Sequence, residues 1–348
     1  MFDLATHPWM RGLFGDDHLA AIFAPEAEVK RMLKVEAAWT RALGDIGETP
    51  DAYSVADSIE AAQIDPQDLQ DGFARDGVPV PALVKMLQAQ LGPDAAEWVH
   101  KGLTSQDVMD TSLVLALQGV LRILLERLQN LDESLDDLQR RFGTARLVAF
   151  TRMQPALETR VAETIGRWRH PVPRLLTSVE TARKQVAQIQ WGGPIGMRDH
   201  PNAAQLGVAF ARNLNLTDPG RSWHMDRSII ANVAHALVQI TTAAGKIGED
   251  IALMAAIGPS QITLSGGGSS AMAHKNNPVK AEALIALSDY AGTLQMSLTR
   301  AARHEGFRSG RAWTLEWIAM PQLCLATGAS LVQTALLLES INGLGANA

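Results

Sequence analysis

A regular spacing of leucine constrains this chain more than any other feature of its sequence. Residues 111–142 contain no proline and a single glycine, Gly119. Leucines recur there in alternating steps of four and three, at positions 117, 121, 124, 128, 131, 135 and 138. Such a mean step, of about 3.5 residues, is typical of a helix that packs along one face. At about 1.5 Å per residue the helix would be roughly 50 Å long, which predicts an elongated helical bundle.

Other parts of the chain repeat this pattern of long segments. The stretches 226–257 and 279–320 contain no proline, and a fourth, 156–190, is broken at Pro171 and Pro173. Aromatic residues make up only 5% of the chain, whereas strands favour aromatic and β-branched side chains. No stretch shows the period-two alternation of a strand. We therefore predict an all-α fold built on an elongated central helical bundle.

The first third of the chain has a different character from the rest. Proline and glycine divide it into short segments, with helices expected at 26–43 and 81–91. The long segments begin only after Asp110. We predict an N-terminal helical domain over 1–108 and a central domain of long helices over 109–348.

Charge and cysteine content exclude several classes of function. The net charge of −6 argues against a nucleic-acid or membrane partner. Cys324 is the single cysteine, so no disulfide forms within the chain, and without a Cys pair or a His-Glu-x-x-His motif no metal site is expected. Cys324 lies in an apolar stretch, and we interpret it as a buried packing residue rather than a nucleophile.

Two uncharged stretches, 228–245 and 317–338, are about as long as a membrane is thick. Both contain polar residues, such as Asn232 and Gln322, which favours helices buried in protein. The N-terminus lacks the basic-then-apolar pattern of a signal peptide, so we expect a cytoplasmic location. Because 228–245 has small residues on nearly every side, we predict a homo-oligomer whose helices surround it. The alternative is a wholly internal helix in a monomer.

Small polar residues gather at the start of the first long helix. His100, Thr104, Ser105 and Asp107 lie within eight positions of one another. Thr104 or Ser105 fits a helix N-cap. The same hydroxyls, together with the free amides of the first turn, would equally form a cradle for a carboxylate. The sequence at this point leaves both interpretations open.

A second polar segment is Thr151-Arg152-Met153-Gln154-Pro155. Pro155 fits the first turn of a helix that follows. Gln154 fits a solvated surface position or a donor aimed into a cleft. Alone, this segment does not decide between the two.

The third segment is the glycine-rich loop 266–278. It contains three glycines and two serines, and Pro278 introduces the next long helix. A plain linker would not require His274, Lys275 and Asn277 within one turn of a helix start. Hydroxyls, an ammonium group and backbone amides together favour negative charge. The spacing of a phosphate-binding P-loop is absent.

These three segments carry a family resemblance. Residues 268–278 resemble the signature Gly-Ser-Ser-x-Met-Pro-x-Lys-x-Asn-Pro of the fumarase/aspartase superfamily. Ala273 takes the place of the first proline in this signature. Residues 104–111 resemble that family's Thr-Ser-x-Asp region. Residues 151–156 resemble its Thr-His-x-Gln-Pro-Ala, with Arg152 in place of the histidine. Three ordered matches make the resemblance specific.

The resemblance implies an architecture. Members have a five-helix central domain that associates into a twenty-helix tetramer core, and each active site takes one segment from each of three subunits. We therefore expect a homotetramer with shared sites. Members continue into a C-terminal helical domain, which we expect to be largely absent from this chain.

Within the superfamily, the chain is most similar to the 3-carboxy-cis,cis-muconate cycloisomerases of the protocatechuate branch of the β-ketoadipate pathway. The segments 80–85, 102–107 and 303–317 resemble theirs. Arg152 favours the same reaction, because arginine does not act as an acid near neutral pH. A carboxylate that attacks or leaves needs orientation rather than protonation. The alternative is a fumarate-releasing lyase of the adenylosuccinate or argininosuccinate type.

The resemblance also implies roles for individual residues. Ser269 would carry the proton, and Lys275 and Asn277 would stabilise the charge that develops on oxygen. The reaction requires no cofactor, and its substrate is a small tricarboxylate. The expected substrate-binding residues are His100, Thr104, Ser105, Arg152, Gln154, Ser270, Met272 and Arg308.

Overall fold

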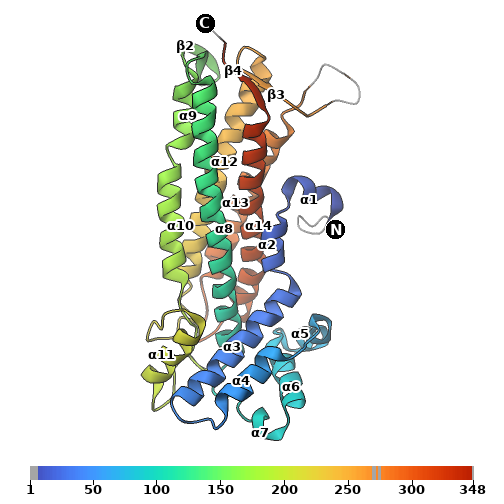
Figure 1. The fold of residues 1–348 in the computed structure, drawn as a ribbon, viewed down its shortest axis with the longest axis vertical. Helices are drawn as coiled ribbons and strands as arrows, with labels where there is room; N and C mark the ends of the chain where they lie inside the picture. Colours follow the sequence, from blue (N-terminus) through green and yellow to red (C-terminus); the bar gives the residue numbers. More distant parts are fainter. Residues whose placement is uncertain (1–6, 269–271, 273–275, 347–348) are drawn as a thin grey trace.

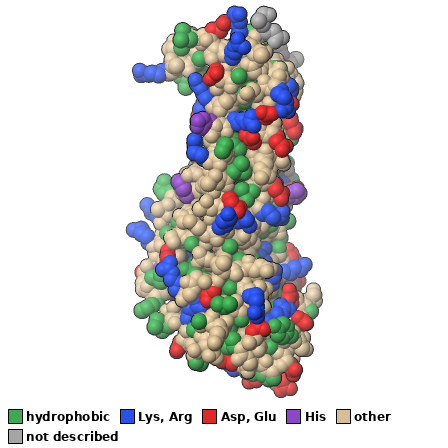
Figure 2. Space-filling view, turned by 60° about the vertical axis from the view of Figure 1, so that its left-hand side comes forward, with side chains coloured by type: hydrophobic (Ala, Val, Ile, Leu, Met, Phe, Trp, Pro, Cys, Tyr) green, Lys and Arg blue, Asp and Glu red, His purple; other side chains and the backbone are tan. Residues whose placement is uncertain are grey.

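The long axis of the molecule is built by a bundle of helices that run side by side (Figure 1). The computed structural model describes residues 7–268, 272 and 276–346. The long helices of the bundle are α8 (Ser105–Phe142), α10 (Val172–Val186), α12 (Ser228–Ile257), α13 (Val279–Ala301) and α14 (Gly310–Glu339). Figure 2 shows the resulting shape, a narrow upper shaft above a broader lower end. The predicted helical fold with an elongated central bundle is confirmed.

The predicted leucine seam forms the inner face of α8. All seven leucines from Leu117 to Leu138 in the alternating pattern are at most 6% exposed. They pack in one apolar cluster with residues of α10, α12 and α14. Burial of this stripe stabilises a helix of 38 residues, because packing of an apolar face contributes more to helix stability than intrinsic propensity.

Shorter helices build the broader end. They are α3 (Pro25–Asp45), α4 (Ala52–Ala61), the 3-10 helix η1 (Pro66–Leu69), α5 (Gln70–Asp76), α6 (Val80–Leu91) and α7 (Pro93–Ala96). Two further short helices lie beside the bundle: α1 (Pro8–Phe14) packs on α13 and α14, and α2 (Asp17–Ile22) packs on α8 and α14. The helices predicted at 26–43 and 81–91 correspond to α3 and α6. A second apolar cluster joins α3 to α11 (Ala203–Leu214), where the rings of Trp39 and Phe210 meet edge to face with centroids 5.3 Å apart.

The single long helix predicted over 279–320 was wrong. The chain forms α13 and α14 instead, separated by residues 302–309. Gly306 takes a positive φ of 63° in this link, and Ser309 caps the new helix by accepting a hydrogen bond from the Ala312 amide at 3.1 Å. Pro321 lies inside α14 and does not end it. Packing of α14 against α8, α12 and α13 offsets the hydrogen bond that proline cannot donate.

The expectation that the chain contains no strand was also wrong. Strand β1 (Arg146–Thr151) pairs antiparallel with β2 (Gln154–Arg160), so Pro155 lies in a strand and α9 (Val161–Arg169) begins only after it. A second small sheet pairs β3 (Ile262–Leu264) with β4 (Ile341–Leu344). None of the seven residues of β2 is buried. The alternation of buried and exposed residues that identifies a strand is therefore missing.

Three of the described helices, α8, α12 and α14, are long and apolar enough to cross a membrane by length and composition alone. Within this chain, 56%, 50% and 72% of their most apolar windows are buried. Their apolar surfaces face one another in the bundle core. Cys324 lies in α14 with no exposed surface, and burial raises the pKa of its thiol, as expected for a packing residue.

Candidate active site

The start of α8 is a capped helix end with a buried carboxylate beneath it. Thr104 is the N-cap residue, and its amide donates to Asp107 Oδ2 at 3.0 Å in a capping box. Its hydroxyl also accepts a hydrogen bond from Arg308 Nη1 at 2.9 Å. The structure therefore shows Thr104 as the helix N-cap, and the Thr104 hydroxyl is also hydrogen-bonded to Arg308. Ser105, the first residue of the helix, is half-buried.

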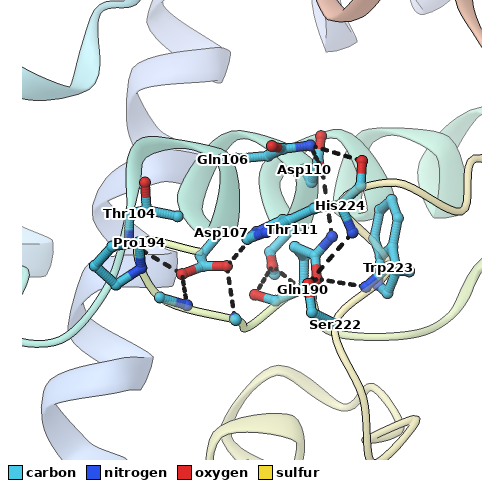
Figure 3. Close-up of polar contacts among 12 residues, drawn as sticks. Thr104, Gln106, Asp107, Asp110, Thr111, Gln190, Pro194, Ser222, Trp223 and His224 are labelled. Atoms are coloured by element: carbon cyan, nitrogen blue, oxygen red, sulfur yellow. Dashed lines mark hydrogen bonds and ion pairs between the residues drawn. The ribbon is translucent and has the colours of Figure 1, made fainter. Parts of the chain in front are cut away.

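Asp107 fastens a distant loop to this helix end (Figure 3). Its Oδ1 accepts from the Gly192 amide and from His224 Nε2, each at 2.8 Å, and its Oδ2 accepts from the Gly193 amide at 3.0 Å. The side chain has no exposed surface. Burial raises the pKa of Asp107, and the hydrogen bonds from His224, Thr104 and Gly193 offset this only in part.

One turn further along α8, Asp110 belongs to a buried ion triad. Arg227 donates to Asp110 Oδ2 at 2.6 Å and to Glu316 Oε2 at 3.0 Å, and each of the three side chains is at most 2% exposed. Trp313 Nε1 donates to Asp110 Oδ1 at 3.0 Å. Burial opposes the charge on Arg227, but the two carboxylates outweigh it and raise the pKa of the guanidinium.

Sequence reasoning missed most of this network. It placed Asp107 among the polar residues at this helix start, but it assigned no role in the site to Asp110, His224, Arg227 or Glu316. One signal was available, because Arg227 directly precedes the uncharged stretch 228–245. A charged residue at the edge of a buried helix needs a partner.

His100 and Arg308 lie at the same end of α8. His100 Nδ1 is 2.6 Å from Glu36 Oε1. Arg308, in the link between α13 and α14, donates to the Pro194 carbonyl at 2.5 Å in addition to Thr104. The structure thus brings together four of the expected substrate-binding residues: His100, Thr104, Ser105 and Arg308.

His304, in the same link, has both ring nitrogens buried without a hydrogen-bond partner among the described residues. Burial and the charge of Arg227 lower its pKa. A neutral ring with a free donor and a free acceptor is therefore present beside the triad.

The remaining expected residues lie at the opposite end of the bundle or outside the described part of the chain. Arg152 and Gln154 are exposed on the β1–β2 hairpin, which follows the far end of α8 (Figure 1). Asn277 is half-buried beside the glycine-rich loop, with its amide bonded to the Gly267 carbonyl at 2.7 Å, and Met272 is 43% exposed. Ser269, Ser270 and Lys275 lie outside the described residues. At about 1.5 Å per residue, the 38 residues of α8 separate the two ends by roughly 57 Å.

A long-helix bundle with a Thr-Ser helix start at one end and a glycine-rich loop at the other defines a class of helical lyases. A family model described as lyase matches residues 11–290, and the chain belongs to this family, the fumarase/aspartase superfamily. The resemblance seen in the sequence is therefore confirmed.

Particular relatives are similar over nearly the whole chain. The 3-carboxy-cis,cis-muconate cycloisomerase of Pseudomonas aeruginosa is 32% identical over 98% of this chain and 77% of its own length. The 3-carboxy-cis,cis-muconate cycloisomerase of Acinetobacter baylyi is 29% identical over 97% of this chain and 77% of its own length. The crystal structure of 3-carboxy-cis,cis-muconate lactonizing enzyme from Pseudomonas putida superposes with a TM-score of 0.90 at 28% identity, covering 97% of this chain and 77% of that one.

Proposed function

We propose that this chain is a 3-carboxy-cis,cis-muconate cycloisomerase, which interconverts 3-carboxy-cis,cis-muconate and 4-carboxymuconolactone. The observation that carries this proposal is the similarity to cycloisomerases over 97–98% of the chain. Arg152 agrees with it, because it replaces a histidine that an eliminating relative would use for its leaving group.

The chemistry is an addition of one substrate carboxylate across a double bond. The new C–O bond forms the lactone, and the adjacent carbon takes a proton. The reverse reaction removes that proton from a carbon next to a carboxylate, so negative charge develops on the carboxylate oxygens in both directions. Ser269 carries the proton, and Lys275 and Asn277 stabilise the developing charge.

The other two carboxylates of the substrate require cations and donors. His100, Thr104, Ser105 and Arg308 supply them from one end of α8, where their close arrangement supports the assignment. Arg152 and Gln154 contribute from the hairpin, and Ser270 and Met272 from the glycine-rich loop.

These groups form one site only if several chains assemble. The roughly 57 Å along α8 between the two sets of residues supports a site shared between subunits. We therefore propose a homotetramer in which three subunits contribute to each site, located in the cytoplasm. We also propose that each chain consists of an N-terminal helical domain, 1–108, and a central domain of long helices, 109–348.

The direct test is turnover of 3-carboxy-cis,cis-muconate by the purified protein, followed as loss of the ultraviolet absorbance of the diene. Lactone should form, and Ser269→Ala should abolish its formation while the oligomer remains intact. A folded oligomer that leaves the diene unchanged, or that releases fumarate from adenylosuccinate or argininosuccinate instead, would contradict the proposal. Full activity in Ser269→Ala would refute only the assignment of the proton carrier.

A further inference from the structure

A buried carboxylate lies directly behind His100. Glu36, on α3, has no exposed side-chain surface, and its Oε1 is 2.6 Å from His100 Nδ1. The His100 side chain is 19% exposed. The pair therefore extends from the core of the molecule to the surface on which the candidate binding residues lie.

The Glu36 carboxyl depends on His100 for its stabilisation. Its second oxygen, Oε2, is buried without a hydrogen-bond partner, and within the described residues His100 is the single side chain bonded to this carboxyl. A buried carboxylate is costly unless it is paired with a cation. An imidazolium at His100 meets that need.

Two carboxylates on different helices act on the charge of His100. Glu36 faces it from α3, and Asp107 acts on it from α8. Lys101 places its ammonium 3.8 Å from the centre of the Trp98 ring, and Arg308 is bonded to Thr104. Burial lowers the pKa of His100, but the hydrogen bond to Glu36 and the charges of Glu36 and Asp107 outweigh it and raise the pKa above its usual range.

The backbone around His100 is also fixed by α3. His100 has a positive φ of 62°, a conformation that non-glycine residues adopt only when their surroundings impose it. Trp39 lies three residues after Glu36 and donates from Nε1 to the Lys101 carbonyl at 2.8 Å. One face of α3 thus holds both the ring and the backbone of this turn.

We propose that Glu36 is a positioning residue, which keeps His100 as an imidazolium and aims its Nε2–H at a carboxylate of the substrate. With Nδ1 occupied by Glu36, Nε2 is the ring nitrogen left for a ligand, and it has no partner in the part of the chain that the structure describes. A charge-assisted hydrogen bond to a carboxylate is about twice as strong as a neutral one. The identity of that carboxylate rests on the proposed function, whereas the state of the ring does not.

The state of the ring is tested by NMR without substrate. Histidine labelled with 13C at Cε1 is titrated from about pH 5 to about pH 9, and His100→Asn identifies the His100 signal. The proton affinity of His100 should fall at least about tenfold in Glu36→Gln. Glu28→Gln, on the same helix and away from His100, should leave it unchanged. An unchanged midpoint in Glu36→Gln overturns the proposal. If Glu36→Gln does not fold, Glu36→Asp serves instead, because moving the carboxylate by one methylene should lower the midpoint in part.

The positioning role is tested by the KM for 3-carboxy-cis,cis-muconate across the same pH range. In the unaltered protein, KM should rise as His100 loses its proton. In Glu36→Gln this rise should begin at lower pH, with KM about tenfold higher at neutral pH and kcat little changed. A lowered midpoint by NMR with an unmoved KM profile overturns the positioning role. Absence of turnover by the unaltered protein would refute the proposed function and leave the NMR result standing.

Discussion

Arg227 is held between two carboxylates in the interior of the bundle. Asp110 comes from α8 and Glu316 from α14, so one guanidinium joins two helices. The planar guanidinium of arginine has several N–H donors, so it can bond to two carboxylates at once better than the ammonium group of a lysine. The arrangement has one positive charge for two negative ones, and its stability depends on the arginine.

Replacing Arg227 with methionine should therefore destabilise the fold strongly. Both carboxylates would remain buried and unpaired, which costs about 3 to 5 kcal/mol in the free energy of unfolding. Urea denaturation at a fixed protein concentration measures the change. Arg221→Met removes an exposed arginine paired with Asp226 at 3.3 Å and should change stability by no more than about 0.5 kcal/mol. Equal effects of the two substitutions would show that the triad adds no stability.

His100 should make stability depend on pH in a defined direction. Its pKa is raised in the folded state, so the folded protein holds this proton more tightly than the unfolded chain. The resulting stabilisation is fully present below about pH 6.5, the usual value for an unfolded histidine, and is lost as pH rises through the raised pKa. Urea denaturation of the unaltered protein and of Glu36→Gln, which lacks the carboxylate that raises this pKa, should give a difference that shrinks with rising pH. A difference that grows with pH would contradict this.

The β1–β2 hairpin is the element in which sequence and structure disagree most clearly. Its two turn residues, Arg152 and Met153, have positive φ angles of 50° and 64°. A two-residue turn with both φ angles positive normally contains asparagine and glycine. Arg152 occupies a strained position at the tip of this turn, which agrees with a role beyond stability.

Replacing Met153 with glycine should relieve this strain without removing Arg152. Left-handed backbone costs a non-glycine residue about 1 kcal/mol, so Met153→Gly should raise the free energy of unfolding by about that amount. Leu157→Gly, in the exposed strand β2, should lower it instead, because φ there is not positive. Urea denaturation of both variants measures this. Destabilisation by Met153→Gly would indicate that the Met153 side chain makes contacts that outweigh the strain.

The whole molecule separates the residues of the proposed site. His100, Thr104 and Arg308 lie near the start of α8. Arg152 belongs to the β1–β2 hairpin and Asn277 directly precedes α13, and β2 and β3 lie at the opposite end of the bundle (Figure 1). A rigid bundle cannot fold one end onto the other. This separation supports the proposal that several chains assemble to form each site.

Mixing two inactive variants should therefore restore activity. Thr104→Val alters one end of the chain and Ser269→Ala the glycine-rich loop, and each alone should lose turnover. After the two are denatured and refolded together in equal amounts, about a quarter of the sites should contain neither change. Each variant refolded alone is the control. A mixture that stays as inactive as its components would show that both residues come from the same subunit.

Much of the fold could be predicted from the sequence because the signals are local. The seam of Leu117 to Leu138 lies within one helix, and each step of three or four residues reports the same buried face. The three segments that resemble the superfamily are also local in the sequence, and membership of the superfamily is confirmed. The hairpin was missed because its exposed strands carry no such period. The break between α13 and α14 was missed because the segment 279–320 contains no proline, which favoured one continuous helix. Gly306 and Ser309 were the available signs of a break, since glycine permits a turn and serine caps a new helix.

The sequence by itself determined that long helices build the core, with α8 and α12 close to their observed bounds, and it determined the family and the residue types that carry the proposed chemistry. Tertiary structure alone decided which polar groups meet. Asp107 contacts Gly192 and His224, which are 85 and 117 positions away, and Glu36 contacts His100 across 64 positions. Periodicity reports the neighbours of a residue within its own helix, whereas these contacts depend on how separate helices pack. The partner of a buried charged group can therefore be identified only from the packed structure.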